Sequence, residues 1–270
     1  MKKYNIGIIG NGFVGSAVSF GFSAQCGFDA NIRIYDVNPK KSTHKLLNVC
    51  NDSNFIFVSI PTPNKDGVID LSAVNQVFYE INQVNNRDDN YFFLRSTVTP
   101  NTTRKLAENY PYLNIVFNPE FLTERTAKFD FINPSRIIIG NEKGEENKKI
   151  KKLFDDRFSN SINIQFMKYE EAELIKYMCN CYFATKLSFL NEIYQISEKL
   201  MCDWETVRTG WLSDGRIGNS HSKIALDGKL GYGGACLPKD IQALTTFADS
   251  LGIDAQTMKG AIKTNNYLRK

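Results

Sequence analysis

Short apolar runs separated by polar, turn-forming segments follow one another along the first 166 residues of this 270-residue chain. Seven runs have the length and composition of strands, at residues 6–9, 32–35, 55–60, 91–94, 114–117, 136–139 and 162–166. The run at 55–60 is continuously apolar, which is typical of a parallel strand buried on both faces. Helical periodicity lies between runs, most clearly at 71–84. We therefore predict an α/β fold with a doubly wound parallel sheet.

The pattern changes after residue 168. Residues 169–201 contain no proline or glycine, and apolar side chains recur at three- and four-residue spacing. This predicts one helix about 45 Å long. Further helices are expected at 204–212, 241–251 and 255–266. We expect two domains, a sheet domain at 1–168 and an all-helical domain at 169–270. The long helix is either the seam of a homodimer or only the spine of its own domain.

Composition limits the classes of function. The chain is 42% hydrophobic, and 33 basic and 29 acidic residues give a net charge of +4 without a long basic tract. We therefore expect no nucleic-acid and no membrane partner, and no run approaches the ~20 apolar residues of a membrane span. The six cysteines lack C-x-x-C spacing, which indicates reduced thiols of a cytoplasmic protein. With only two histidines, no metal site is predicted.

The first predicted strand runs into Gly10-Asn11-Gly12-Phe13-Val14-Gly15, a G-x-G-x-x-G pattern. Between a strand and a helix, this pattern is typical of a Rossmann-type dinucleotide site: the glycines permit a tight turn and close approach of a pyrophosphate. Asp36 follows about twenty residues later, where a carboxylate would bind the ribose hydroxyls and favour NAD over NADP. Asp36 could instead be an ordinary turn residue, and the neighbouring Lys40 and Lys41 leave NADP open.

A second glycine-rich turn, at 231–236, ends in Cys236 and is followed by Pro238. Proline suits the first turn of a helix, so Cys236 is predicted at or just before a helix N-terminus. There the helix dipole and free N–H groups lower the pKa of a thiol. Asp240 lies one helical turn further on, close enough to hold a water or accept a proton. We interpret Cys236 as a nucleophile; the alternative is a buried structural cysteine.

Three predicted strands end in polar loops. These are Pro61-Thr62-Pro63, Arg95-Ser96-Thr97-Val98 and Asn118-Pro119-Glu120-Phe121-Leu122-Thr123-Glu124. Doubly wound folds bind ligands at the carboxyl ends of their strands, so we expect the three loops to converge on the cofactor edge.

These motifs occur together and in order, and the set resembles the UDP-glucose dehydrogenase (nucleotide-sugar dehydrogenase) family over essentially the whole chain. The most specific parts are G-Y-G-G-A-C-L-P-K-D, which contains Cys236, and N-P-E-F-L-x-E, which ends at Glu124. The resemblance implies oxidation of a sugar primary alcohol, C6 of UDP-glucose or a related sugar nucleotide, to a carboxylate with two NAD⁺. Cys236 would trap the aldehyde as a thiohemiacetal, which becomes a thioester that water hydrolyses.

The resemblance also implies roles for individual residues. The implied catalytic set is Cys236, Lys176, Asn180, Asp240, Glu124 and Thr97, with Lys176 and Asn180 on the oxyanion and Asp240 as general base. With the glycine motif, the expected cofactor contacts are Gly10, Gly12, Phe13, Val14, Gly15, Asp36, Lys41, Pro61, Thr62, Thr97, Glu124 and Lys239. The implied substrate contacts are Glu120, Phe121, Leu122, Lys176, Asn180, Arg216, Lys223, Tyr232 and Gly233.

Each of these residues also has a plainer interpretation. In isolation, Lys176 would be a solvated helix lysine and Arg216 a surface charge. His221 is as readily a loop-stabilising residue as a ligand contact.

Two functions remain open. The first, which we favour, is a compact NAD-dependent dehydrogenase of a nucleotide sugar or a smaller sugar derivative, because the implied catalytic set is unbroken. The second is an NAD-binding module without turnover, either a fragment or one subunit of a split enzyme. The family continues into a further nucleotide-binding domain that clasps the UDP, and we expect that domain to be absent from this chain.

Overall fold

The computed structural model describes residues 3–270, which form two compact units. The first unit extends to Thr62 and continues over Asp70–Lys176; the second comprises Pro63–Ile69 and Tyr177–Lys270. The boundary in the long helix therefore lies eight residues after the predicted domain start at 169. The reason is that Tyr169 and Ala172, in the first turns of that helix, are buried in the core of the first unit. The sequence pattern also does not predict that residues 63–69 belong to the second unit.

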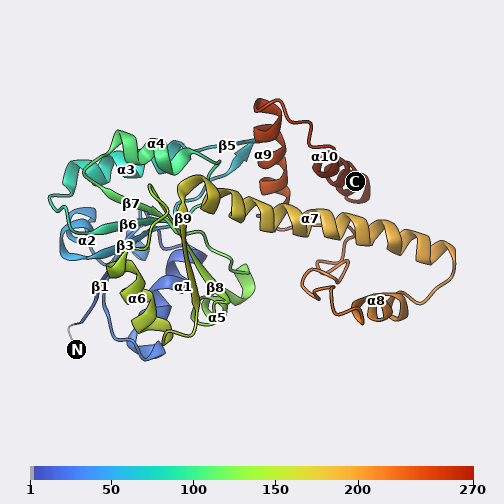
Figure 1. Cartoon of the computed structure of the whole chain (residues 1–270), viewed down its shortest axis with the longest axis horizontal. Helices are drawn as coiled ribbons and strands as arrows, with labels where there is room; N and C mark the ends of the chain where they lie inside the picture. Colours follow the sequence, from blue (N-terminus) through green and yellow to red (C-terminus); the bar gives the residue numbers. More distant parts are fainter. Residues whose placement is uncertain (1–2) are drawn as a thin grey trace. The chain divides into compact units, whose positions relative to one another are not determined.

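A seven-stranded sheet forms the centre of the first unit, in the order β2-β1-β3-β6-β7-β8-β9 (Figure 1). The strands are β1 (Asn5–Ile9), β2 (Asn31–Tyr35), β3 (Phe55–Val58), β6 (Tyr91–Leu94), β7 (Asn114–Phe117), β8 (Arg136–Asn141) and β9 (Asn163–Lys168). Strands β1, β2, β3, β6 and β7 pair with one another in parallel. This confirms the predicted α/β doubly wound arrangement.

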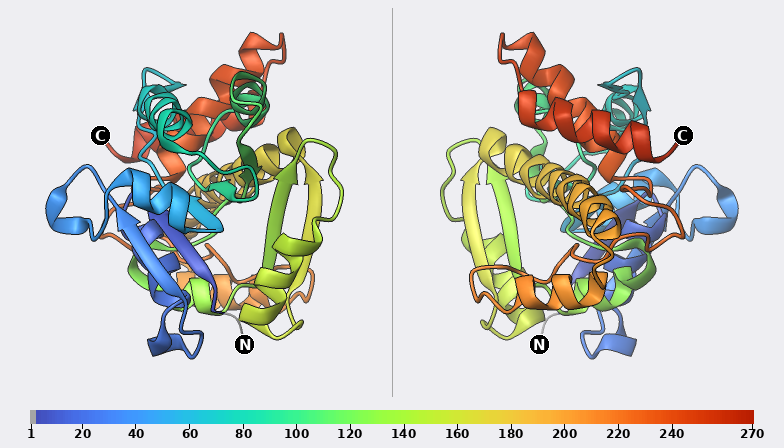
Figure 2. Two further views of the ribbon diagram at one scale, coloured as in Figure 1. Left: turned by 90° about the vertical axis from the view of Figure 1, so that its left-hand side faces the viewer. Right: turned by 90° about the vertical axis from the view of Figure 1, so that its right-hand side faces the viewer.

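One junction of the sheet differs from the predicted parallel arrangement. β8 is antiparallel to β7 and meets it at a single residue pair, Phe117 with Gly140. β9 then runs parallel to β8, and the two strands form the yellow-green edge of the sheet in Figure 2. The prediction of a wholly parallel sheet is therefore wrong at this junction, because an apolar run carries no information about strand direction.

Helices cover both faces of the sheet (Figure 1). One face carries α2 (Leu46–Asp52), α3 (Ser72–Val84) and α4 (Thr102–Asn109); the other carries α1 (Phe13–Gly21), α5 (Ala127–Ile132) and α6 (Lys148–Phe158). Because successive strand residues point to opposite faces, Ile56 and Val58 of β3 join the first core and Phe55 and Phe57 join the second. Single 3₁₀ turns lie at Ala24–Cys26, Pro39–Lys41 and Glu124–Thr126.

From residue 177 onward the second unit contains helices and loops, as predicted, whereas its 63–69 segment forms a strand hairpin that departs from the all-helical prediction. Its helices are α7 (Tyr169–Lys199, 31 residues, beginning in the first unit), α8 (Trp204–Leu212), α9 (Leu237–Ser250) and α10 (Gln256–Leu268). Among residues 3–270, no helix combines the length and the apolarity that crossing a membrane requires.

A short hairpin joins the second unit to the loop that follows β3. Its strands are β4 (Asn64–Lys65) and β5 (Val68–Ile69), and the turn residues Asp66 and Gly67 have φ of 51° and 84°. Positive φ at both positions is the geometry of the two-residue hairpin turn that Asp-Gly favours. The side-chain amide of Asn64 donates to the carbonyl of Lys239 at 3.0 Å, so the hairpin is anchored to the first turn of α9.

Candidate functional site

The glycine-rich turn of the first unit has an open backbone at the start of α1. Gly10 has φ of +85°, and a Cβ there would lie 2.2 Å from the carbonyl oxygen of Ser59. Gly12 is the N-cap of α1, and a Cβ there would meet no atom within 4 Å. No side chain of the described residues caps this helix. Uncapped N–H groups beside open space form a cradle for an anionic pyrophosphate.

Asp36 lies at the end of β2, next to this turn. Its carboxylate accepts hydrogen bonds from the backbone N–H groups of Asn11, at 2.7 Å, and Asn38, at 2.8 Å. The side-chain amide of Asn11 in turn donates to the carbonyl of Lys41 at 3.0 Å. Hydrogen bonds therefore connect the glycine turn, Asp36 and Lys41 at the carboxyl ends of β1 and β2. These residues fit the phosphate and ribose of a dinucleotide.

The loops after β3 and β6 are interlocked. The Ser96 hydroxyl donates to the carbonyl of Ile60 at 2.7 Å and accepts from its N–H at 2.8 Å. The Thr62 hydroxyl donates to the carbonyl of Thr97 at 2.8 Å. Thr62 and Thr97 are thus held side by side. The strand order predicts this, because β3 and β6 are neighbours whose carboxyl ends share one edge of the sheet.

The loop after β7 carries a buried ion pair. The Lys176 ammonium, 3% exposed, donates to the Glu120 carboxylate at 2.7 Å and to the Glu120 carbonyl at 2.6 Å. Burial alone would raise the pKa of Glu120, but the charge and hydrogen bond of Lys176 outweigh burial and hold that pKa below its usual range. Lys176 is therefore not a solvated helix lysine. Glu124, four residues after Glu120, is exposed in the 3₁₀ turn.

The thiol motif of the second unit begins α9. Cys236 is the N-cap residue, Pro238 lies in the first turn, and the Asp240 N–H donates to the Cys236 carbonyl at 2.9 Å. This confirms the predicted place of Cys236 at a helix N-terminus. Asp240 is fully buried, and its two carboxylate oxygens accept from the Asn180 amide, at 2.5 Å, and from the Lys239 ammonium. Both oxygens are thus fixed one helical turn from the thiol.

Two other cysteines differ from Cys236 in their surroundings. Burial raises the pKa of Cys50 to about 12, and burial together with the charge of Asp240 raises the pKa of Cys181 to about 12. Thiols with such values are protonated and unreactive near pH 7. Cys236, by contrast, is partly exposed and lies at a helix N-terminus.

Two buried asparagines hold the glycine-rich turn, and the sequence analysis missed both. The N–H of Gly231 donates to the Asn191 side chain at 3.0 Å, and the N–H of Tyr232 donates to the Asn265 side chain at 2.6 Å. Asn191 on α7 is fully buried and Asn265 on α10 is 6% exposed. An amide on the apolar side of a helix was the available signal, because a buried polar side chain needs a partner. Gly233 lies against the ion pair of Asp227 with Arg269.

The loop between α8 and α9 does not bring all predicted residues together. Arg216 is exposed and pairs with Asp214, two residues away, at 2.5 Å, and Lys223 is also exposed. His221 stacks on Phe183 of α7 with ring centroids 3.9 Å apart. Burial, with a smaller contribution from Lys186, lowers the pKa of His221. This packing is what a loop-stabilising histidine requires.

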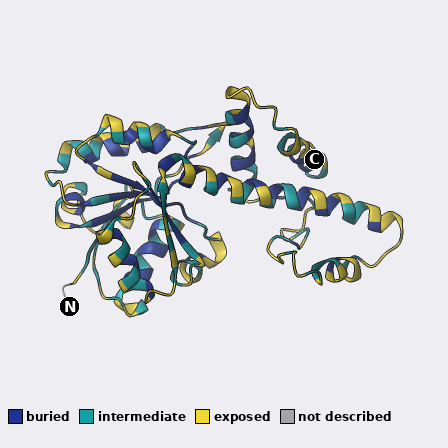
Figure 3. Ribbon diagram, viewed as in Figure 1, coloured by how far each residue is buried: buried dark blue, intermediate teal, exposed yellow. Residues whose placement is uncertain are grey.

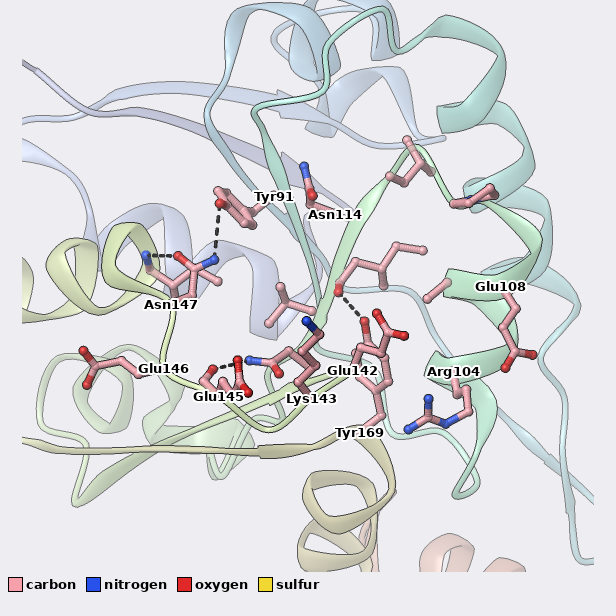
Figure 4. Close-up of a pocket in the computed structure, with 17 residues that line it drawn as sticks. Tyr91, Arg104, Glu108, Asn114, Glu142, Lys143, Glu145, Glu146, Asn147 and Tyr169 are labelled. Carbon is pink, nitrogen blue, oxygen red and sulfur yellow. Dashed lines mark hydrogen bonds between the residues drawn. The ribbon is translucent and has the colours of Figure 1, made fainter.

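The first unit also contains a cavity of about 550 Å³ that includes none of the predicted site residues. It lies beside β7 and the end of β8, and Figure 4 shows Glu142, Glu145 and Glu146 projecting from the segment after β8. A dashed line in that figure joins Asn147 to the Tyr91 hydroxyl, 3.3 Å apart. Because none of the predicted cofactor residues line this cavity, we do not assign it to the dinucleotide.

Comparison with known families agrees with the division into units. The NAD-binding domain of the UDP-glucose/GDP-mannose dehydrogenase family matches residues 41–158, and the central domain of the same family matches residues 170–267. The chain belongs to this family. Membership identifies residues 41–158 of the first unit as part of an NAD-binding domain, and the glycine turn and Asp36 precede the matched residues in the same unit.

Family members with curated names are moderately similar to this chain. It is 29% identical to UDP-glucose 6-dehydrogenase of Rickettsia prowazekii, over 97% of this chain and 66% of the relative. It is 35% identical to the Bacillus subtilis enzyme of the same name, over 79% of this chain and 49% of the relative. A solved UDP-glucose dehydrogenase from Pyrobaculum islandicum matches with a TM-score of 0.82 at 26% identity, covering 98% of this chain and 68% of that one. The chain thus spans about half to two thirds of the relatives' lengths.

Proposed function

We propose that this protein is an NAD-dependent dehydrogenase that oxidises the C6 alcohol of UDP-glucose, or a related sugar nucleotide, to the carboxylate. One observation carries the proposal: Cys236 caps α9, and Asp240, one turn further on, is buried and fixed by Asn180 and Lys239. A nucleophilic thiol with a positioned carboxylate fits an oxidation that passes through an acyl-enzyme. Family membership and the names of the relatives support the substrate class.

NAD⁺, when bound, accepts a hydride in each of the two oxidations. In this proposal the N-terminus of α1 at Gly12 and Phe13 binds the pyrophosphate, and Asp36 binds the ribose hydroxyls. A carboxylate at this position repels the 2′-phosphate of NADP, which supports NAD as the cofactor. Loop residues Pro61, Thr62 and Thr97, at the carboxyl ends of β3 and β6, complete the proposed cofactor site.

The proposed chemistry of the chain begins after the first oxidation has produced an aldehyde. The Cys236 thiolate adds to the carbonyl carbon, and the carbonyl oxygen becomes an alkoxide. Lys176 and Asn180, one turn apart on α7, are proposed to donate hydrogen bonds to that oxygen. The Lys176 ammonium has three N–H donors, and its two hydrogen bonds to Glu120 leave one for such a role.

Loss of a second hydride from the thiohemiacetal leaves a thioester on Cys236. Asp240 is proposed to orient a water molecule and take its proton as the water attacks the thioester carbon. The carbon–sulfur bond then breaks, the electron pair returns to sulfur, and the carboxylate is released. The balance is one alcohol, one water and two NAD⁺ giving one carboxylate, two NADH and three protons.

A homodimer through α7 belongs to this proposal. Met178, Tyr182, Phe189, Ile196 and Leu200 are between 52% and 67% exposed. Their spacing of four and seven residues places the first four along one side of α7 and Leu200 directly after its end; Figure 3 shows exposed positions alternating with buried ones along this helix. An exposed apolar stripe on a long helix is typical of an association surface. In a two-fold dimer the same stripe of a second copy would pack against it. The six free cysteines support a cytoplasmic location.

A second candidate rests on length. Because the chain spans only part of its relatives, it could be an NAD-binding component whose activity requires another polypeptide. Mixing the purified protein with NAD⁺ and UDP-glucose, and following the absorbance of NADH, separates the two. A dehydrogenase that is active by itself forms NADH in this mixture. An NAD-binding component that needs another polypeptide binds NAD⁺ in a direct titration but forms no NADH.

A further inference from the structure

A second cavity of the first unit, of about 210 Å³, lies on the α5–α6 side of the β7–β8 junction. Its wall combines aromatic side chains, including Phe121, Phe131 and Phe154, with the guanidinium groups of Arg95 and Arg136. Most of the lining residues lie in the segment between β7 and β8, two strands that meet at a single residue pair.

Arg95 is the unusual residue of this wall. It follows β6 directly and is 5% exposed. One terminal nitrogen donates to the Asn118 side chain, and the guanidinium faces the rings of Phe131, at 5.7 Å, and Phe57, at 6.0 Å. Its Nε is buried and has no hydrogen-bond partner among residues 3–270. A buried donor without an acceptor is costly, and here it belongs to a charged group that lines a cavity.

The charges around Arg95 do not balance. Arg95 and Lys176 are both cations buried to 5% exposure or less, and the carboxylate that acts on both is Glu120. Both oxygens of Glu120 are already used, by Lys176 and by the N–H of Leu122. Burial lowers the pKa of Arg95 to about 10, so its guanidinium remains charged near pH 7. One buried positive charge is therefore left for a further anion to neutralise.

The cavity walls define the anion. The Arg136 guanidinium packs over the Phe121 ring at 4.3 Å, which places a second cation at the wall. Asp130 also lines the cavity, and its carboxylate accepts from Thr123 and Thr126. A negative group in the wall, together with the aromatic rings, disfavours a multiply charged ligand. An engineered apolar cavity of about 150 Å³ holds benzene, so this larger one has room for a ring with a carboxylate.

We infer that this cavity is a binding site for a small organic monocarboxylate, with the carboxylate on Arg95 and Arg136 and the apolar part against Phe131 and Phe154. Arginine binds carboxylates through paired, charge-assisted hydrogen bonds, and the guanidinium of Arg95, which lines the cavity, provides donors beyond the one that bonds Asn118. The site is distinct from the glycine turn and from the thiol motif, and it requires neither cofactor nor turnover.

Calorimetric titration with benzoate, and with its neutral isostere benzamide, tests the inference on the full chain without NAD⁺ or sugar. We expect saturable one-to-one binding of benzoate in the millimolar range or tighter, at least about tenfold stronger than benzamide. Arg95→Met should weaken benzoate at least about tenfold. Ser135→Trp, which places a bulky ring at an exposed lining position outside the core, should do the same by filling part of the cavity. Arg104→Met, which removes a cation from the 550 Å³ cavity, is the matched control and should change affinity less than about twofold.

Three results would overturn the inference: no benzoate binding by the folded protein, equal binding of benzoate and benzamide, or benzoate binding that both Arg95→Met and Ser135→Trp leave intact. If Arg95→Met does not fold, as judged by circular dichroism, Ser135→Trp still decides the location of the site. Inorganic phosphate serves as a further probe, and tighter binding of phosphate than of benzoate would refute the assigned ligand class. None of these outcomes depends on dehydrogenase activity.

Discussion

Lys176 and Glu120 lie in surroundings where neither charge is stable alone. Both are buried, and removing one partner from such a pair typically costs about 3–5 kcal/mol, because an uncompensated charge remains. The pair also determines where the ammonium points, since the ammonium donates to both the carboxylate and the carbonyl of a single residue. The proposed oxyanion donor is therefore oriented before a substrate binds.

Asp36 carries a prediction at the same scale. Asp36→Ala should weaken NAD⁺ binding by about 1.5–3 kcal/mol through the loss of charge-assisted hydrogen bonds to the ribose. The same change removes the repulsion of a 2′-phosphate, so the ratio of NADP⁺ to NAD⁺ affinity should rise. Asp52→Ala, which removes an exposed carboxylate of α2 from its pair with Arg33, is the control. Titration of both cofactors decides the matter, and an unchanged ratio in Asp36→Ala would refute the assigned role.

At the scale of elements, α4 depends on a side chain from another helix. Asn101, its N-cap residue, makes no capping bond of its own. Glu173 of α7 instead accepts from the N–H groups of Asn101, at 2.6 Å, and Thr103, at 2.8 Å. Glu173 is fully buried, and burial raises its pKa from 4.5 to about 7 despite these bonds. The cap therefore joins the start of α7 to the β6–α4 segment through a carboxyl that titrates near neutral pH.

This cap predicts a pH dependence of stability. Because the pKa of Glu173 is higher in the folded state, folding takes up a proton between pH 4.5 and about 7, and stability falls as the pH rises through this window. The effect should reach about 3 kcal/mol. Glu173→Gln should remove it, so the free energy of unfolding of the parent, relative to this variant, should decline from pH 5 to pH 8 in urea titrations.

Glu170→Gln is the matched control, one turn earlier on α7. The hydrogen bond from Arg104 lowers the pKa of Glu170, so its contribution has the opposite sign and is lost as the pH falls. A parent and Glu173→Gln that share one pH profile would show that the cap does not titrate in this range.

At the scale of the whole molecule, the stripe on α7 predicts association. Light scattering should give a mass of twice the 30.7 kDa of one chain. Met178→Lys combined with Tyr182→Lys places charges in the stripe and should give single chains. Glu198→Lys, at an exposed position on the opposite side of α7, should leave the dimer intact. A parent protein with the mass of one chain would support the other interpretation, in which α7 is only the spine of its domain.

The apolar pattern predicted the positions of the sheet strands, most accurately where the strands are buried on both faces. β6 and β7 lie at the predicted residues because strands buried on both faces are continuous apolar runs. The reversed direction of β8 could not be predicted in this way, since apolar content is the same for both directions. The 64–69 hairpin had a local signal, Asp66-Gly67, that its surrounding polar residues concealed.

The candidate site was predictable where chemistry is local in sequence. Cys236, Pro238 and Asp240 lie within one helical turn, so their mutual placement follows from helix geometry. Asn191 and Asn265 act on the same turn from 40 and 33 residues away, and only the packing of α7 and α10 brings them there. The pairing of Lys176 with Glu120 likewise joins residues 56 apart.

Covalent catalysis by Cys236 is the central claim, and NADH formation by three proteins tests it most directly. With UDP-glucose and NAD⁺, the parent should form two NADH for each sugar oxidised. Cys236→Ser should form no acid while it still binds NAD⁺ in a separate titration, because the glycine turn and Asp36 are unchanged. Cys202→Ser, which alters an exposed thiol, should behave as the parent. Oxidation to the acid by Cys236→Ser at the parent rate would contradict the account.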